Sequence, residues 1–145
     1  RPLSRGSVQI RSADPFDQPR IEPRYFSEAL DRETMVSGLQ WLRDIYAQPA
    51  FRGLWDLETM PGPAVATRQQ LWDFARSRGG TVFHPVGTCR MGSDAQAVLD
   101  PQLRVRGVEG LRVIDASAMP TLTSANTNAP TIMIGERGAD FLLGA

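Results

Sequence analysis

Polar and apolar residues alternate near the start of the chain, in residues 6–12, where Val8 and Ile10 fall on one side. This period of two predicts a half-buried β-strand. Residues 13–23 then contain three prolines and two aspartates that favour turns. We therefore expect a loop after the strand.

Two longer stretches have the spacing of amphipathic helices. We expect Asp31 to cap the first, which runs to about Tyr46. Its apolar residues recur every three or four positions: Met35, Leu39, Leu42 and Ile45. The second helix is expected from about Thr67 to Arg78 and ends at a pair of glycines.

The second half of the chain mixes short apolar runs with turns. Short strands are expected at residues 81–83, 103–105 and 111–114. A polar loop, residues 124–130, leads into a last helix over about residues 130–143. Within that helix, Gly135 and Gly138 indicate close packing against another backbone, because glycine lowers helix propensity.

Composition narrows the class of protein. The chain has 145 residues, enough for one domain, and its apolar content of 41% is ordinary for a soluble fold. Its 16 basic and 16 acidic residues cancel, so the charge gives no sign of binding to nucleic acid or to an anionic membrane. No apolar run approaches the roughly 20 residues that span a bilayer. One cysteine and one histidine allow no intrachain disulfide and give no metal site.

The chain begins Arg-Pro-Leu-Ser, with neither an initiator methionine nor a signal-peptide pattern. We therefore expect it to be part of a longer polypeptide. Because its cysteine usage gives no sign of an oxidising compartment, the expected location is the cytoplasm.

His84 is the first candidate for chemistry. It is the only histidine, and Pro85 restricts its backbone to extended conformations, which fixes the direction of its side chain. Histidine is also the side chain best suited to proton transfer near neutral pH. Two interpretations stay open on these grounds: a catalytic base, or a structural histidine bonded to a nearby carbonyl.

The polar loop before the last helix is the second candidate. A helix N-terminus offers free N–H groups and partial positive charge, which suit an anionic or polar part of a cofactor. Asn128 as a simple N-cap explains the same residues structurally, and the residues alone favour that explanation. Asp115 ends an apolar run before small residues that would let a ligand approach the backbone, but by itself this is a weak signal of ligand binding. Cys89 and Met91 are interpreted as packing residues, and three arginines as a solvated face: Arg104, Arg106 and Arg112.

Several enzyme classes are not supported by the motifs. The chain has no Gly-x-Ser-x-Gly elbow of serine hydrolases and no phosphate-binding P-loop. It also has no Gly-x-Gly-x-x-Gly dinucleotide fingerprint.

Several longer motifs together resemble one family. They are FHPVGTCRMG (residues 83–92), VLDPQLRV (98–105), GVEGLRVIDAS (107–117) and NTNAPTIM (126–133). In this order and spacing they resemble the C-terminal region of glucose–methanol–choline (GMC) oxidoreductases, above all the choline-dehydrogenase-like and aryl-alcohol-oxidising members. The resemblance covers nearly the whole chain.

The resemblance implies a mixed α+β and α/β fold, the C-terminal part of a two-domain flavoprotein. Residues 1–80 would belong to an antiparallel-sheet substrate-binding domain. Residues 81–145 would supply the catalytic loop and the last strand and helix of a Rossmann-like FAD-binding domain.

The resemblance also implies oxidation of an alcohol to an aldehyde or ketone, by hydride transfer to FAD. His84 matches the base that takes the hydroxyl proton, and Asn126 matches a residue that hydrogen-bonds the substrate oxygen. The remaining matches concern the cofactor: Asp115, Ala116, Thr127 and Asn128.

The family's Gly-rich fingerprint lies in an N-terminal FAD-binding part. We expect that part in the same polypeptide or in a complementary chain, and we expect no tight FAD binding or turnover by residues 1–145 alone. The alternative is a non-catalytic binding or assembly module derived from the family.

Overall fold

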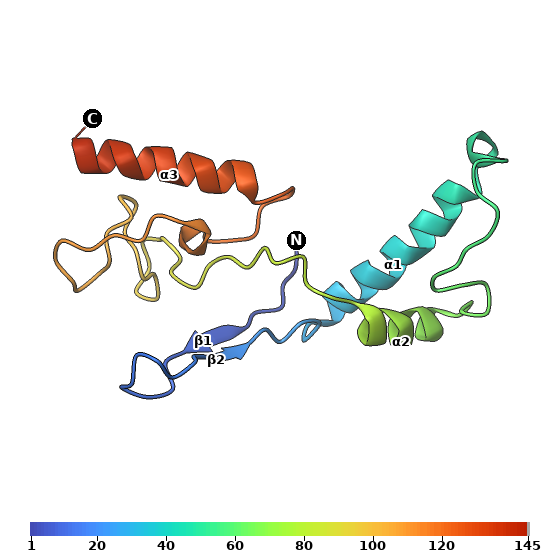
Figure 1. The fold of residues 1–145 in the computed structure, drawn as a ribbon, viewed down its shortest axis with the longest axis horizontal. Helices are drawn as coiled ribbons and strands as arrows, with labels where there is room; N and C mark the ends of the chain where they lie inside the picture. Colours follow the sequence, from blue (N-terminus) through green and yellow to red (C-terminus); the bar gives the residue numbers. More distant parts are fainter. Residues whose placement is uncertain (145) are drawn as a thin grey trace. The chain divides into compact units, whose positions relative to one another are not determined.

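The computed structural model describes residues 1–144. Its elements in chain order are β1 (Ser7–Gln9), β2 (Arg20–Glu22), α1 (Ala29–Tyr46), the 3-10 turn η1 (Pro49–Phe51), α2 (Arg68–Arg78), the 3-10 turn η2 (Ala116–Ala118) and α3 (Asn128–Leu143) (Figure 1). The chain packs as two compact units. The first holds residues 1–2, 7–21 and the described chain from residue 82 onward, and the second holds residues 3–6 and 22–81.

The two predicted domains do not coincide with these units, which group residues by packing within this chain alone. The assignment of residues 1–80 to a substrate-binding domain and of residues 81–145 to an FAD-binding domain therefore stays a prediction. The last residue of the second predicted domain, Ala145, lies outside the described residues.

The first strand pairs within a hairpin that the sequence only half predicted. β1 forms a two-stranded sheet with β2, which lies inside the expected loop, so the expectation of a continuous loop over residues 13–23 is wrong. Gly6 explains the close approach, because a Cβ there would lie 2.3 Å from the Glu22 carbonyl oxygen. Val8 and Ile10 are both exposed in the described chain, so the strand is not half-buried there.

Helix α1 begins at Ala29 after Glu28, so Asp31 lies inside the first turn and is not the N-cap as predicted. Its carboxylate is buried and turned toward residues near the chain start. It accepts hydrogen bonds from the Leu3 amide (2.8 Å), the Ser4 amide (2.7 Å) and the Ser4 hydroxyl. Asp31 therefore holds the start of the chain against α1 within the second unit.

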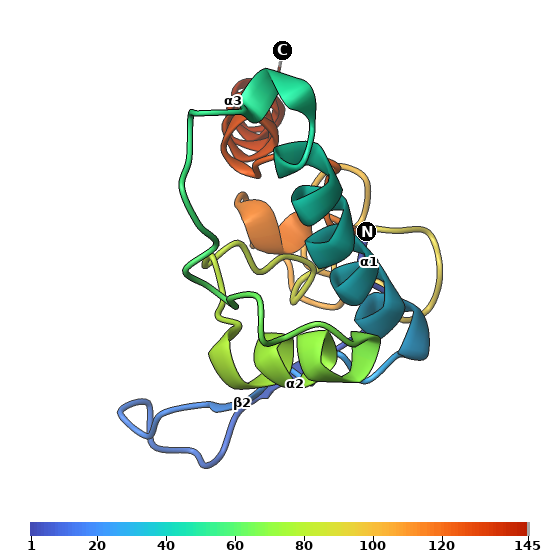
Figure 2. The same cartoon turned by 90° about the vertical axis from the view of Figure 1, so that its right-hand side faces the viewer.

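Helix α2 begins where the sequence predicted. Thr67 and Gln70 form a capping box, in which the Thr67 hydroxyl accepts from the Gln70 amide and the Gln70 side chain accepts from the Thr67 amide. The helix packs against α1, and Figure 2 shows the two helices lying against each other. Leu71 is fully buried in this unit, and Val36 of α1 is buried as well.

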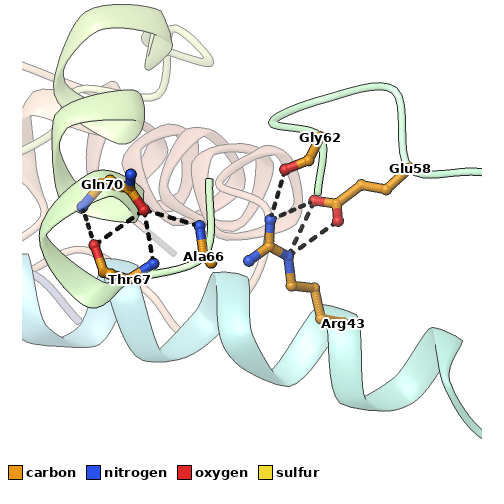
Figure 3. Close-up of polar contacts among 6 residues, drawn as sticks. All are labelled: Arg43, Glu58, Gly62, Ala66, Thr67 and Gln70. Carbon is orange, nitrogen blue, oxygen red and sulfur yellow. Dashed lines mark hydrogen bonds and ion pairs between the residues drawn. The ribbon is translucent and has the colours of Figure 1, made fainter. Parts of the chain in front are cut away.

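An ion pair joins α1 to the irregular segment before α2. The Arg43 guanidinium donates to both carboxylate oxygens of Glu58, through Nε (3.1 Å to each) and Nη2 (2.9 Å to Oε1). Its Nη2 also donates to the Gly62 carbonyl at 3.2 Å (Figure 3). Because the fork geometry satisfies two acceptors at once, this one side chain fixes the segment next to the helix.

The first unit is built mostly from turns around a small core. Its buried residues are Leu99, Leu103, Ala118, Met119 and Ile134. The expected strands at residues 103–105 and 111–114 are reduced to isolated bridges, in which Leu99 pairs with Val105 and Arg104 pairs with Arg112. The expected strand at 81–83 is wrong, and Phe83 there has a φ of 59°. A strand needs a continuous ladder of partners, which these segments do not find within the described chain.

Helix α3 begins two residues before the expected Pro130, because proline is tolerated in a first turn whose N–H groups lack helical partners. Near its other end the helix passes close to Ile114, and a Cβ on Gly138 would lie 2.3 Å from Ile114 Cγ2. The predicted close packing is thus found at Gly138, against a side chain. Around Gly135 the described residues leave open space.

The Asp31 interactions predict a pH dependence. Hydrogen bonds from the Ser4 hydroxyl and the Leu3 and Ser4 amides favour the charged carboxylate, and they lower the pKa of Asp31 below its ordinary 3.8. The resulting stabilisation is complete above pH 3.8 and is lost as the pH falls through the lowered pKa. We expect the Leu3 and Ser4 amides to lose protection from hydrogen exchange over that acidic range.

In the variant Asp31→Asn, the protection of the Leu3 and Ser4 backbone amides should be weak already at neutral pH and insensitive to acid. The reason is that a side-chain carboxamide carries no titrating charge. An unchanged acid profile in this variant would show that another group controls the chain start.

The Gly138 contact predicts a cost for adding one methyl group. Gly138→Ala should lower the free energy of unfolding by about 1–3 kcal/mol, because the methyl overlaps Ile114 in a packed region. Denaturant unfolding measures this loss. The control is Gly135→Ala on the same helix, which should raise stability by up to about 1 kcal/mol through helix propensity. Equal effects at both positions would contradict the role of the Ile114 contact.

Candidate active site

The loop that carries His84 is anchored by its backbone to η2. The Cys89 amide donates to the Ser117 carbonyl (3.1 Å), and the Met91 amide donates to the Ala118 carbonyl (2.9 Å). The side chains of Cys89 and Met91 pack against the core of the first unit, as predicted for both. These contacts fix the downstream half of the loop.

A glycine makes the turn of this loop possible. Gly87 has a φ of +87°, in the left-handed region that side chains other than glycine's rarely adopt. A Cβ at this position would also lie 3.3 Å from the Met119 carbonyl oxygen. The turn therefore depends on a missing side chain three residues after His84.

His84 meets the residues just before α3, although they lie more than forty positions away in the sequence. Its Nδ1 lies 2.9 Å from the Thr127 hydroxyl, and its Nε2 lies 3.5 Å from Nδ2 of the Asn126 amide. His84 and Asn126 are exposed in the described chain, whereas Thr127 is buried. One edge of the imidazole is thus held by a buried hydroxyl while Nε2 faces an accessible amide.

The turn at the start of α3 is built differently from the prediction. Thr127 occupies the N-cap position, and Asn128 is the first helical residue, so the N-cap assignment of Asn128 is wrong. The reason is that Asn126 supplies the local bond, since its Oδ1 accepts from the Asn128 amide at 2.9 Å. The Asn128 side chain is left exposed at the helix start.

Asp115 and Ala116 belong to a different part of the same unit. Asp115 precedes η2, and its Oδ1 accepts from the Ser117 amide at 2.7 Å and from the Ser117 hydroxyl. Ala116 packs against the core. Neither residue hydrogen-bonds His84 in the described chain, so they join the site through η2 and the loop that it anchors.

Of the three arginines predicted to form a solvated face, Arg104 and Arg106 are exposed, whereas Arg112 is not. Arg104 pairs with Asp100 (2.7 Å), and Arg106 donates to the Gly92 carbonyl (2.7 Å). Arg112 is partly buried; its Nη2 lies 3.3 Å from the Phe141 carbonyl near the end of α3, and its Nε is buried with no partner among the described residues. Guanidinium groups can bond carbonyls within a fold, a use that a surface interpretation overlooks.

Polar groups at the start of α3 and at Asp115 could form hydrogen bonds with FAD. Within the described first turn of α3, the Asn128 amide is bonded to Asn126, Pro130 has no N–H, and the Ala129 N–H has no partner. This amide and the exposed Asn128 carboxamide can donate to carbonyl or phosphate oxygens. Oδ2 of the exposed Asp115 carboxylate accepts no hydrogen bond from residues 1–144 and can accept from a hydroxyl.

Residues 1–144 contain no group of three or more metal-binding side chains that could hold a metal ion. Among the described helices, none is long and apolar enough to cross a membrane.

The local sequence does not predict the contact between Thr127 and His84. Thr127 was assigned to the cofactor through the resemblance, and nothing in the local pattern links it to a histidine 43 residues away. The one available signal was a hydroxyl residue next to a helix start, which usually indicates a cap.

Known proteins resemble this chain over nearly its whole length. Residues 2–135 match the sequence profile of the C-terminal domain of GMC oxidoreductases. The alcohol dehydrogenase [acceptor] of Pseudomonas putida is 46% identical over 98% of this chain, and the choline oxidase of Arthrobacter globiformis is 47% identical over 98%. The chain covers 26% and 27% of these relatives, so it spans about a quarter of their length.

The fold of this chain is also similar to part of a solved flavoprotein structure. An FAD-dependent oxidoreductase from Chaetomium thermophilum superposes with a TM-score of 0.90 and 33% identity, over 97% of this chain and 25% of its own. The predicted fold class, the C-terminal part of a flavoprotein, is confirmed, and the cofactor of the family is FAD. This chain belongs to the GMC oxidoreductase family.

Proposed function

We propose that this chain supplies the proton-transfer site of an FAD-dependent enzyme that oxidises an alcohol to an aldehyde or ketone. The observation that carries the proposal is the position of His84, an exposed residue whose Nε2 lies 3.5 Å from the Asn126 amide just before α3. Membership of the GMC oxidoreductase family supports an oxidation reaction at this position.

His84 would act as the base. When the C–H bond of an alcohol is broken as hydride, positive character develops at carbon, and removal of the hydroxyl proton relieves it. A positioned base contributes typically 10²–10⁴-fold to such a step. Asn126 lies beside Nε2 and would hydrogen-bond the substrate oxygen, so that the hydroxyl proton is directed to the histidine.

The cofactor would be held by residues already matched to it. Bound FAD would supply the acceptor of the hydride. Asp115 and Ala116 would lie along its hydroxyl-bearing part, and Thr127 and Asn128 would lie by the flavin. The N-terminus of α3 carries partial positive charge and would favour negative charge at the cofactor.

The rest of the protein would complete the site. Because the chain spans about a quarter of its relatives, we propose that the N-terminal FAD-binding part lies in the same polypeptide. Residues 1–145 alone should then neither hold FAD tightly nor turn over. The substrate class would be alcohols whose identity depends on residues beyond this chain.

The test is anaerobic reduction of the full-length protein by a panel of aliphatic, aromatic and amino alcohols. Bleaching of the flavin absorbance should be fast with at least one alcohol. In His84→Ala it should be slower by at least about a hundredfold, because the base is lost while the cofactor remains. Flavin content, measured before mixing, separates loss of chemistry from loss of cofactor.

The matched control is Arg76→Gln on the exposed face of α2, which should bleach like the parent. Equal rates in the parent and in His84→Ala would remove His84 from the proposal. A full-length protein that binds no flavin would instead favour the non-catalytic module.

A further inference from the structure

We propose that Thr127 is a positioning residue that holds neutral His84 with its proton on Nδ1 and leaves Nε2 as the base. This inference rests on the proposed function of His84. It assigns the Thr127 hydroxyl to His84, while the turn that contains Thr127 would still lie by the flavin.

The first step fixes the orientation of the Asn126 amide. A backbone N–H can only donate, so the Asn128 amide identifies its partner at 2.9 Å as the Asn126 oxygen, Oδ1. The other end of the side chain is therefore the Nδ2 group. Nδ2 carries two protons and has no acceptor capacity.

The second step fixes the state of Nε2. Asn126 Nδ2 lies 3.5 Å from His84 Nε2, a long contact in which the amide must be the donor. A proton on Nε2 would set two donors against each other. The contact is favourable only when Nε2 carries its lone pair, so in the proposed neutral ring the single proton lies on Nδ1.

The third step gives Thr127 its role. With the proton on Nδ1, the ring donates to the Thr127 hydroxyl oxygen at 2.9 Å, a normal hydrogen-bond length. The opposite tautomer would require Thr127 to donate to Nδ1 and would leave Nε2 protonated. That tautomer could not accept a proton from an alcohol at Nε2.

Thr127 is well suited to hold this bond. Only 6% of the residue is exposed, so water competes weakly for its hydroxyl. Its carbonyl accepts from both the amide (3.0 Å) and the hydroxyl (2.7 Å) of Thr131, which ties the residue to the first turn of α3. The acceptor is therefore fixed before the substrate arrives.

The proton balance follows from this arrangement. The alcohol O–H bond breaks and a new N–H bond forms at Nε2, which gives an imidazolium. Its Nδ1–H continues to donate to Thr127, and this bond strengthens because the donor is now charged. The same hydroxyl thus selects the reactive tautomer and stabilises its product.

The first test reads the tautomer directly, without substrate. The full-length protein is labelled with ¹⁵N-histidine, and the His84 signals are assigned by their loss in His84→Gln. The long-range ¹H–¹⁵N pattern of the neutral ring should show a protonated Nδ1 and an unprotonated Nε2. A protonated Nε2 would overturn the proposal, and this measurement needs no variant of Thr127.

The second test compares two substitutions of Thr127. Thr127→Val keeps the shape but loses the hydroxyl, and it should slow anaerobic flavin reduction at saturating alcohol by about tenfold, in line with a hydrogen bond to a group that becomes charged. The affinity for alcohol should change little. Thr127→Ser keeps the hydroxyl and should restore most of the rate and the parent NMR pattern.

The outcomes separate this inference from the proposed function. A slow His84→Gln together with a Thr127→Val that keeps the parent rate and ring pattern would leave His84 as the base and overturn the role of Thr127. Parent rates in His84→Gln would overturn the proposed function itself. If Thr127→Val fails to fold, the tautomer in the parent protein still decides the matter.

Discussion

Two backbone hydrogen bonds hold the parts of the site in register. They run from the amides of Cys89 and Met91 to the carbonyls of η2, and they fix the loop that begins at His84. Because backbone bonds do not depend on side-chain identity, this anchor restricts the loop more than its irregular sequence suggests. Everything proposed for His84 requires that the loop stay on η2, since the imidazole meets Asn126 and Thr127 only from this position.

Local patterns predicted the helices well. The capping box at Thr67 and the spacing of apolar residues define α2 almost to the residue, because these signals act within one turn of chain. The resemblance to the family likewise named Asn126 and His84, which the structure brings into contact. The helix predictions succeeded because their signals lay within short segments of the chain.

Several of the errors share a physical cause, which is that a residue's partner lies far along the sequence. Asp31 looks like a cap until the amides of residues 3 and 4 appear beside it, and Arg112 looks solvated until the end of α3 lies next to it. The apolar runs at 103–105 and 111–114 look like strands, but a strand is defined by its neighbours, and the described chain provides only single bridges. No local pattern contains these contacts.

Helix α3 connects a packing contact near its C-terminal end to the residue that bonds His84 at its N-terminal end. Gly138 lies against Ile114 toward one end, and Thr127 stands at the other, roughly 16 Å away at 1.5 Å per residue. If α3 moved as a rigid body, a displacement at Ile114 would also shift the hydroxyl that bonds His84. Catalysis is sensitive to misplacement of about 1 Å. The size of the residue at position 138 would therefore influence the position of the Thr127 hydroxyl, which it does not touch.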